Sequence, residues 1–242
     1  MKIELYGYTD IGSRPENEDS SSYERLGENR FYAAVADGLG GHEDGKAASQ
    51  IAIRYLTSSW EDTPLLPTAA QLQERLAVAN GEILVSRRGA DQMKSTIVAL
   101  YVWENQAIWV HIGDSRLYHY HNGALAHYTR DHSVPQISVQ LGEITRNQIP
   151  DHPDRSRLLR VLGSEELKPE FAGPIDLAPG QHAFLLCSDG FWEYLQEDEL
   201  LLDLSKSLTP KQWIDYLRWR GDKRRSPDAD NNTAIAAFVE VT

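Results

Sequence analysis

The sequence contains a single cysteine, Cys187, which leaves no second thiol for a disulfide bond or a thiolate metal cluster. Cys187 lies inside an apolar run, where a small buried residue is the expected role. A phosphatase that uses a cysteine nucleophile also needs an arginine six positions later to hold the phosphate, and Glu193 occupies that position. The cysteine content therefore excludes thiol-based phosphate chemistry.

Long apolar runs and basic residues are also scarce. No run approaches the roughly 20 apolar residues that span a bilayer, and the N-terminal residues enter an alternating strand pattern instead of a signal peptide. The 24 Lys and Arg residues face 36 Asp and Glu residues, which gives a formal charge of -12 at pH 7. Long-range repulsion then disfavours nucleic acid and anionic membranes as partners. We expect a cytoplasmic monomer that binds neither.

The remaining composition favours one domain over residues 1–242, because 41% of the residues are hydrophobic and no linker or repeat interrupts the chain. Apolar spacing predicts strands at 3–9, 31–36, 95–103, 106–113, 116–121, 124–129, 169–175, 182–188 and 233–241. Helical spacing predicts helices at 45–60, 67–86, 197–205 and 209–220. The Asn-Gly pair at 122–123 indicates a tight hairpin, whose strands must be antiparallel. The fold class is therefore α+β with mostly antiparallel sheet, and residues 131–166 form an irregular surface excursion.

Three apolar segments end in an aspartate: Asp37, Asp114 and Asp189. Asp230 stands just before the last apolar run. Carboxylates at strand ends can converge at a sheet edge, where they repel one another unless a cation lies among them. Each acid alone is an ordinary turn or capping residue. Their recurrence at one kind of position predicts a divalent-metal site.

Five stretches together resemble the metal-dependent protein serine/threonine phosphatases of the PP2C (PPM) family. They are Gly12-Ser13-Arg14-Pro15-Glu16-Asn17-Glu18-Asp19, Ala36-Asp37-Gly38-Leu39-Gly40-Gly41-His42, Gly113-Asp114-Ser115-Arg116, Ser188-Asp189-Gly190 and Asp230-Asn231-Asn232-Thr233. They follow the order and spacing of the compact bacterial members, and the resemblance extends from about residue 7 to residue 239. It implies a four-layer αββα sandwich, in which two antiparallel β-sheets pack face to face and helices flank both.

The resemblance implies a centre with two Mn²⁺ or Mg²⁺ ions. Asp37 would bridge the ions, Asp189 and Asp230 would complete one of them, and the backbone carbonyl of Gly38 would serve the other together with waters. Hard cations of this kind prefer oxygen ligands. Asp114 resembles a ligand of a third, weaker ion, although a simple turn aspartate is the alternative interpretation.

The same resemblance assigns roles around the ions. Glu18 and Asp19 match residues that orient the metal-bound waters, and Arg14 matches the arginine that holds the phosphate. A planar guanidinium can bind two phosphate oxygens at once. Arg116 is expected to be a structural partner for nearby carboxylates.

The implied reaction is hydrolysis of phosphoserine and phosphothreonine in proteins by a hydroxide that bridges the two metal ions, without a covalent enzyme intermediate. The substrates would be those of a cognate bacterial Ser/Thr kinase. The sequence departs from part of the family at Leu39, where some members carry a histidine that can protonate the leaving group. His42 is a second candidate for that proton donor, and a metal-bound water is the default.

Two alternatives stay open. Residues 40–47 nearly spell a nucleotide-binding P-loop, although Ala47 replaces the hydroxyl residue that would bind Mg²⁺. A catalytically silent phosphoprotein-binding module on the same fold is the other alternative. The alternating His119 and His121 suggest a metal pair, but without a third nearby ligand we expect them to face solvent.

Overall fold

The chain forms two five-stranded antiparallel sheets that pack face to face in the computed structural model, which describes residues 1–40, 43–60, 63, 65–87 and 93–242. The first sheet runs in the order β1 (Lys2–Asp10), β12 (Asn232–Val241), β11 (Gly180–Cys187), β8 (Arg116–His121) and β9 (Ala124–Tyr128). The second runs β10 (Glu170–Asp176), β7 (Gln106–Ile112), β6 (Ile97–Trp103), β3 (Arg30–Ala36) and β2 (Ser20–Arg25). The short strands β4 (Gly38–Leu39) and β5 (Lys94–Ser95) pair separately.

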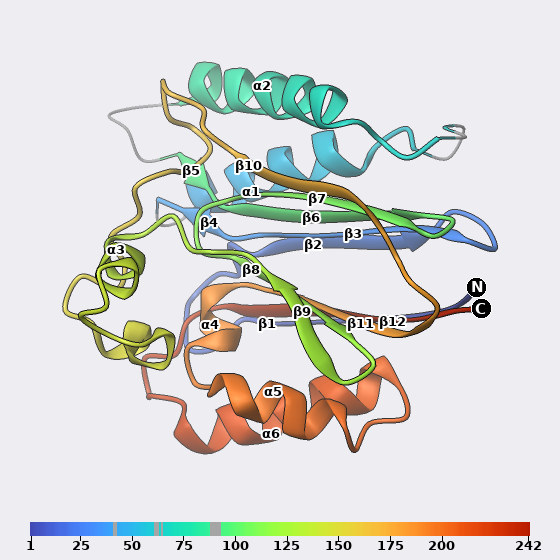
Figure 1. Cartoon of the computed structure of the whole chain (residues 1–242). Coiled ribbons are helices and arrows are strands. Elements are labelled where there is room, and N and C mark those ends of the chain that lie inside the picture. Colours follow the sequence, from blue (N-terminus) through green and yellow to red (C-terminus); the bar gives the residue numbers. More distant parts are fainter. Residues whose placement is uncertain (41–42, 61–62, 64, 88–92) are drawn as a thin grey trace.

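Helices cover the outer face of both sheets (Figure 1). The helices α1 (Glu43–Thr57) and α2 (Ala69–Ser86) lie over the sheet that contains β3 and β6, and α5 (Glu197–Leu204) and α6 (Pro210–Arg224) lie under the other sheet. The short α4 (Asp189–Trp192) follows β11 directly. The helix α3 (Val134–Gln140) and the 3₁₀ turn η1 (Arg146–Asp151) project at one end of the sandwich. The predicted four-layer αββα sandwich is therefore confirmed.

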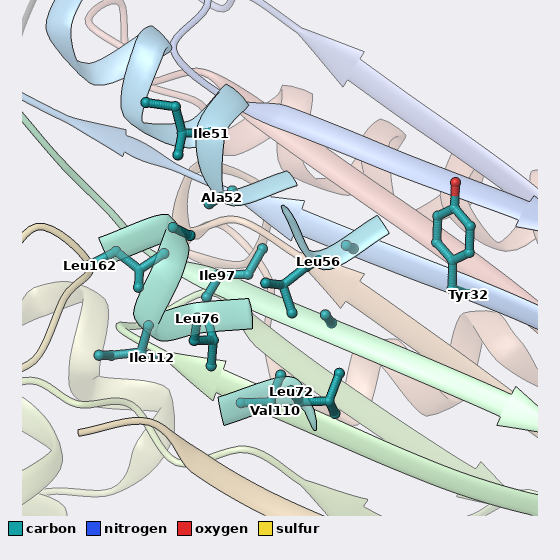
Figure 2. Close-up of a cluster of buried hydrophobic side chains, with 14 of the residues drawn as sticks. Tyr32, Ile51, Ala52, Leu56, Leu72, Leu76, Ile97, Val110, Ile112 and Leu162 are labelled. Atoms are coloured by element: carbon teal, nitrogen blue, oxygen red, sulfur yellow. The ribbon is translucent and has the colours of Figure 1, made fainter. Parts of the chain in front are cut away.

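The apolar content of the central strands follows from this layering. On β3, Phe31, Ala33 and Val35 point into the core between the sheets, whereas the intervening Tyr32 and Ala34 pack against the helix layer. The cluster between this sheet and the helix layer is drawn in Figure 2, where side chains of α1 and α2 meet those of the sheet. A strand covered on both faces reads as a continuous apolar run. This explains why the central strands could be predicted from apolar content.

The edge strand β2 was not predicted from the sequence. Ser20-Ser21-Ser22 opens it, and most of its residues are exposed, so it shows no apolar alternation. It exists because its backbone pairs with β3, in a register that sets Ser20 opposite Ala36. No helix of the described residues has the length and hydropathy that a bilayer span requires.

Candidate metal centre

Asp37 follows β3 and is fixed through its backbone. Its N–H donates to the Thr96 hydroxyl at 3.0 Å, and its carbonyl accepts from the Thr96 N–H at 2.8 Å and from the Ser95 hydroxyl at 2.9 Å. At the next position, a Cβ on Gly38 would lie 2.1 Å from the carbonyl oxygen of Gly45. The absence of a side chain at Gly38 therefore lets α1 approach the aspartate.

Asp189 begins α4, immediately beyond β11. The neighbouring backbone is equally crowded, because a Cβ on Gly190 would lie 2.2 Å from the carbonyl oxygen of Asn231. The N–H of Ser188 donates to the carbonyl of Thr233 at 3.0 Å. The end of β11 and the start of β12 thus place Asp189 beside Asp230, 41 positions later in the chain.

The electrostatics show that the acids form one cluster. Burial raises the pKa of Asp37 well above its ordinary value, and the charges of Asp189, Asp19 and Asp114 raise it further. Burial also raises the pKa of Asp19 to about 7, with Asp189 and Asp230 contributing. The pKa of Asp189 is raised to about 6 by burial and then by Asp230. The pKa of Asp114 is raised well above its ordinary value by burial and then by the charge of Asp189.

The cluster fits a hard cation. Oδ1 of Asp19 and Oδ1 of Asp189 are buried and have no hydrogen-bond partner among the described residues. The second oxygen of Asp19 accepts from the Ser188 hydroxyl at 2.8 Å. Buried carboxylate oxygens without donors are costly unless a cation neutralises them. An all-oxygen donor set of this kind suits Mg²⁺ or Mn²⁺.

A cavity of about 240 Å³ opens beside the cluster, and Arg14, Asp114, Asp189 and Asp230 line it. Nη2 of Arg14 donates to Oδ2 of Asp230 at 2.8 Å. The remaining lining comes from α4 and the residues that follow it, from the loop before β12, which contributes Ser226 and Asp228, and from the 131–166 excursion, which contributes Arg155. Three of the predicted acids, Asp114, Asp189 and Asp230, therefore line one opening together with Arg14, and the excursion lines it too. Asp37 and Asp19 lie behind this lining, where their charges act on Asp189 and on each other.

Glu18 reaches the same region through its backbone, whose N–H donates to Oδ1 of Asn231 at 2.8 Å. The side-chain amide of Asn231 also donates to the carbonyls of Ile11 at 2.8 Å and Glu16 at 2.9 Å. Asn231 thus joins the first loop to the last one, which is a structural role that sequence reasoning did not assign. Its place inside the quoted motif is the signal that could have found it.

Arg116 is buried away from the cavity and binds Asp131 with two hydrogen bonds of 2.8 and 2.7 Å. Its guanidinium lies 3.4 Å from the centroid of the Trp192 ring, whose N–H donates to the carbonyl of Asp114 at 3.0 Å. The prediction that Arg116 is a structural partner of a carboxylate is confirmed. Trp192 was missed, because nothing local in the sequence connects α4 to the turn at Asp114.

The nucleotide-binding alternative finds no support in this arrangement. Lys46, which would have to reach a phosphate, donates instead to Oε1 of Glu16 at 2.8 Å. Gly41 and His42 lie outside the described residues, so the structure does not place the proposed proton donor His42.

Comparison with known proteins points to a single family. The family model described as Protein phosphatase 2C matches residues 6–219. The chain is 34% identical over 213 residues to the serine/threonine phosphatase Stp of Listeria monocytogenes, covering 84% of each protein. Among solved structures it is similar to PppA of Pseudomonas aeruginosa, with a TM-score of 0.82, 31% identity and coverage of 98% and 97% of the two chains. It is also similar to the catalytic domain of the phosphatase PstP in complex with two manganese ions, with a TM-score of 0.78, 26% identity and coverage of 98% and 99%.

Proposed function

Since this chain belongs to the protein phosphatase 2C family and is a metal-dependent protein serine/threonine phosphatase, we propose that its carboxylate cluster is the catalytic metal centre. One observation carries the proposal: buried carboxylates from both sheets converge beside one cavity, and oxygens of Asp19 and Asp189 are left without donors. A silent binding module on the same fold would not need this charge cluster.

Asp37, Asp189, Asp230 and the carbonyl of Gly38 would hold two ions, Mn²⁺ or Mg²⁺, and Asp114 would contribute to a third. The similar PstP structure contains two manganese ions, which supports this number. When bound, such a pair of ions lowers the pKa of a shared water and neutralises charge on a phosphoryl group. The crowded backbone at Gly38 and Gly190 keeps the ligand-bearing loops together before any ion binds.

Arg14 would bind the phosphate. Its guanidinium donates to Asp230, so an ion on that carboxylate would compete for the same oxygen and leave the planar fork free for two phosphate oxygens. Glu18 and Asp19 would accept hydrogen bonds at the edge of the centre, as Asp19 already does from Ser188. Glu18 and Asp19 would orient the metal-bound waters, and Arg14 would hold the phosphate at the cavity that it lines.

The substrates would be phosphoserine and phosphothreonine proteins made by a partner Ser/Thr kinase in the cytoplasm, with the enzyme acting as a monomer. The similar PppA is described as a key regulatory component of the T6SS. A bacterial assembly controlled by phosphorylation is therefore a reasonable first substrate to test.

The test is Mn²⁺-dependent hydrolysis of p-nitrophenyl phosphate and of a phosphothreonine peptide. Asp37→Asn and Asp189→Asn should each abolish turnover, because each removes a charge that the ions require. Asp176→Asn is the matched control, because that acid lies on β10 and accepts from Gln106 at 3.0 Å, outside the cluster. Near-normal Mn²⁺-dependent rates in Asp37→Asn would overturn the assignment.

A further inference from the structure

A second group of polar side chains lies away from the cavity, formed by His111, His132 and Glu170. Their ligand-type atoms all lie within 4.8 Å of one another. Both histidines are buried, and their rings stack with centroids 4.6 Å apart and planes 11° from parallel. By spacing alone the group could hold a metal ion.

The hydrogen bonds point to a different role. The N–H of Gly113 donates to Nδ1 of His132 at 3.2 Å, so in the neutral ring the proton is on Nε2. That nitrogen faces Oε2 of Glu170 and Nη1 of Arg160, each at 3.4 Å. Burial, aided by His111 and Arg160, lowers the pKa of His132 to about 4, which keeps the ring neutral near pH 7. A protonated nitrogen beside a guanidinium is a poor metal ligand.

His132 instead forms two hydrogen bonds with the turn that carries Asp114. It donates its own N–H to the carbonyl of Gly113 at 2.9 Å while it accepts the N–H of Gly113 on its ring. Gly113 has φ +103°, and a Cβ there would lie 2.6 Å from the Thr96 side chain. Trp192 holds the other side of the turn through the carbonyl of Asp114. The orientation of Asp114 therefore depends on His132.

His132 itself stands at the start of the 131–166 excursion, which we call the flap, and is bonded to its later part. The carbonyl of His132 accepts from the N–H of Leu159 at 2.8 Å, and the next turn is fixed by the N–H of Val134, which donates to the carbonyl of Arg157 at 2.9 Å. Because the flap also contributes Arg155 to the rim of the cavity, His132 is bonded to both the substrate side and the ion side.

We propose that His132, oriented by Glu170, is a positioning residue that joins the flap to the Asp114 turn and sets the affinity of the centre for the ion that Asp114 shares. This inference rests on the proposed function. Loss of an outer hydrogen-bonding partner commonly costs roughly 10- to 100-fold in metal affinity. Binding equilibria are reciprocal. If this ion changes the affinity for a substrate that contacts the flap by some factor, that substrate changes the affinity for the ion by the same factor.

The test is calorimetric titration of the metal-stripped full chain with Mn²⁺. His132→Ala should weaken the weakest class of sites by roughly 10- to 100-fold and leave the tightest class unchanged. His132→Asn should restore most of the affinity, because its amide oxygen can accept the Gly113 N–H at the position of Nδ1. Ser133→Ala is the matched control: its hydroxyl is buried and has no hydrogen-bond partner among the described residues, so no change is expected.

Four results would overturn the inference. His132→Ala could leave the weak class intact, or it could weaken all classes together with a loss of thermal stability, which would mark a purely structural residue. His132→Asn could behave like His132→Ala, which would show that the hydrogen bond accepted by Nδ1 of His132 does not set the ion affinity. Asp114→Asn could titrate like the parent protein, and then no ion depends on that turn. In each case the tight class, tested by Asp37→Asn, still reports on the proposed function.

Discussion

Arg14 already pairs with a protein carboxylate, that of Asp230, and we propose that it also binds the phosphate. Its side chain is 52% exposed and lines the cavity beside Asp189 and Asp230. The charge of Asp230 raises the pKa of Arg14, so the guanidinium stays protonated near neutral pH. Titration of the Arg14 side chain should therefore not change its contribution to substrate binding near neutral pH. That contribution should depend on the planar shape of the guanidinium.

We predict that Arg14→Ala raises KM for a phosphothreonine peptide by roughly 10- to 100-fold, because a hydrogen bond to a charged group is worth about 1.5–3 kcal/mol. The value of kcat should change much less. Arg14→Lys should recover only part of the loss, since a point charge cannot match two oxygens at once. Steady-state kinetics at saturating Mn²⁺ measure both constants.

Arg54→Ala is the control for Arg14, because that arginine is also exposed and paired with a glutamate, Glu82, on the helical layer. It should leave both constants unchanged. A fall in kcat at constant KM in Arg14→Ala would instead place the guanidinium at the transition state, and full recovery in Arg14→Lys would show that charge alone is sufficient.

Among the structural elements, β8 corrects a sequence prediction. His119 and His121 were expected to face solvent, but His119 is only 2% exposed and His121 is half-buried. Its Nε2 lies 2.9 Å from Nδ1 of His182 on β11, and its ring stacks on Phe184 at 4.3 Å and on His127 of β9 at 5.5 Å. Alternation normally leaves one strand face in water. Here the sandwich covers both faces of β8 from Arg116 to Tyr120, so both sets of alternating side chains are buried up to the last residue of the strand.

This burial predicts a pH dependence of stability. Burial, with His182 and His127 contributing, lowers the pKa of His119 to about 3, against about 6.5 in an unfolded chain. Below pH 6.5 the unfolded chain binds a proton that the folded protein excludes, so the contribution of His119 is complete above pH 6.5 and declines toward pH 3. His119→Phe removes this term. The free energy of unfolding of His119→Phe minus that of the parent should therefore increase as the pH falls, by at most about 1.4 kcal/mol per pH unit.

Urea unfolding of both proteins at pH 7, 6 and 5 measures that difference. The carboxylates are common to the two proteins and cancel, and the lost hydrogen bond to His182 should appear mainly as an offset at pH 7. A difference that stays constant with pH would mean that His119 takes up its proton over the same pH range in the folded protein as in the unfolded chain.

The elements also show what could be predicted from the sequence. Buried strands such as β3 and β6 were predicted because both faces are apolar, and the hairpin at Asn122-Gly123 was confirmed with φ of 48° and 76°. The edge strand β2 was missed because its pairing with β3, not its own side chains, makes it a strand.

The candidate site divides in the same way. The acids could be found because strand ends are a local feature of the sequence. The contacts of Trp192 and His132 with the Asp114 turn could not, because they join segments far apart in the chain and leave no local pattern. The catalytic roles of Arg14 and Asp37 stay predictions.

At the scale of the whole molecule, the first and last strands are neighbours in one sheet. β1 pairs with β12 from Lys2 opposite Glu240 to Asp10 opposite Asn232, and the two termini lie side by side (Figure 1). The candidate centre also joins the layers, because Asp37 follows β3 of one sheet while Asp189 follows β11 of the other. Neither sheet can complete the site alone, which supports the prediction of one domain over residues 1–242.

We therefore predict a single calorimetric unfolding transition that Mn²⁺ shifts upward. Each ion at 100 times its Kd should add about 2.7 kcal/mol, because it binds the folded state only. Leu100→Ala, which leaves a cavity between the sheets, should lower the free energy of unfolding by about 2–5 kcal/mol but keep the Mn²⁺ shift. Asp37→Asn should lose the shift, because its ligand is gone while the core is intact. Two separate transitions, or an Mn²⁺ response confined to one of them, would show that the sheets fold independently and that the centre does not couple them.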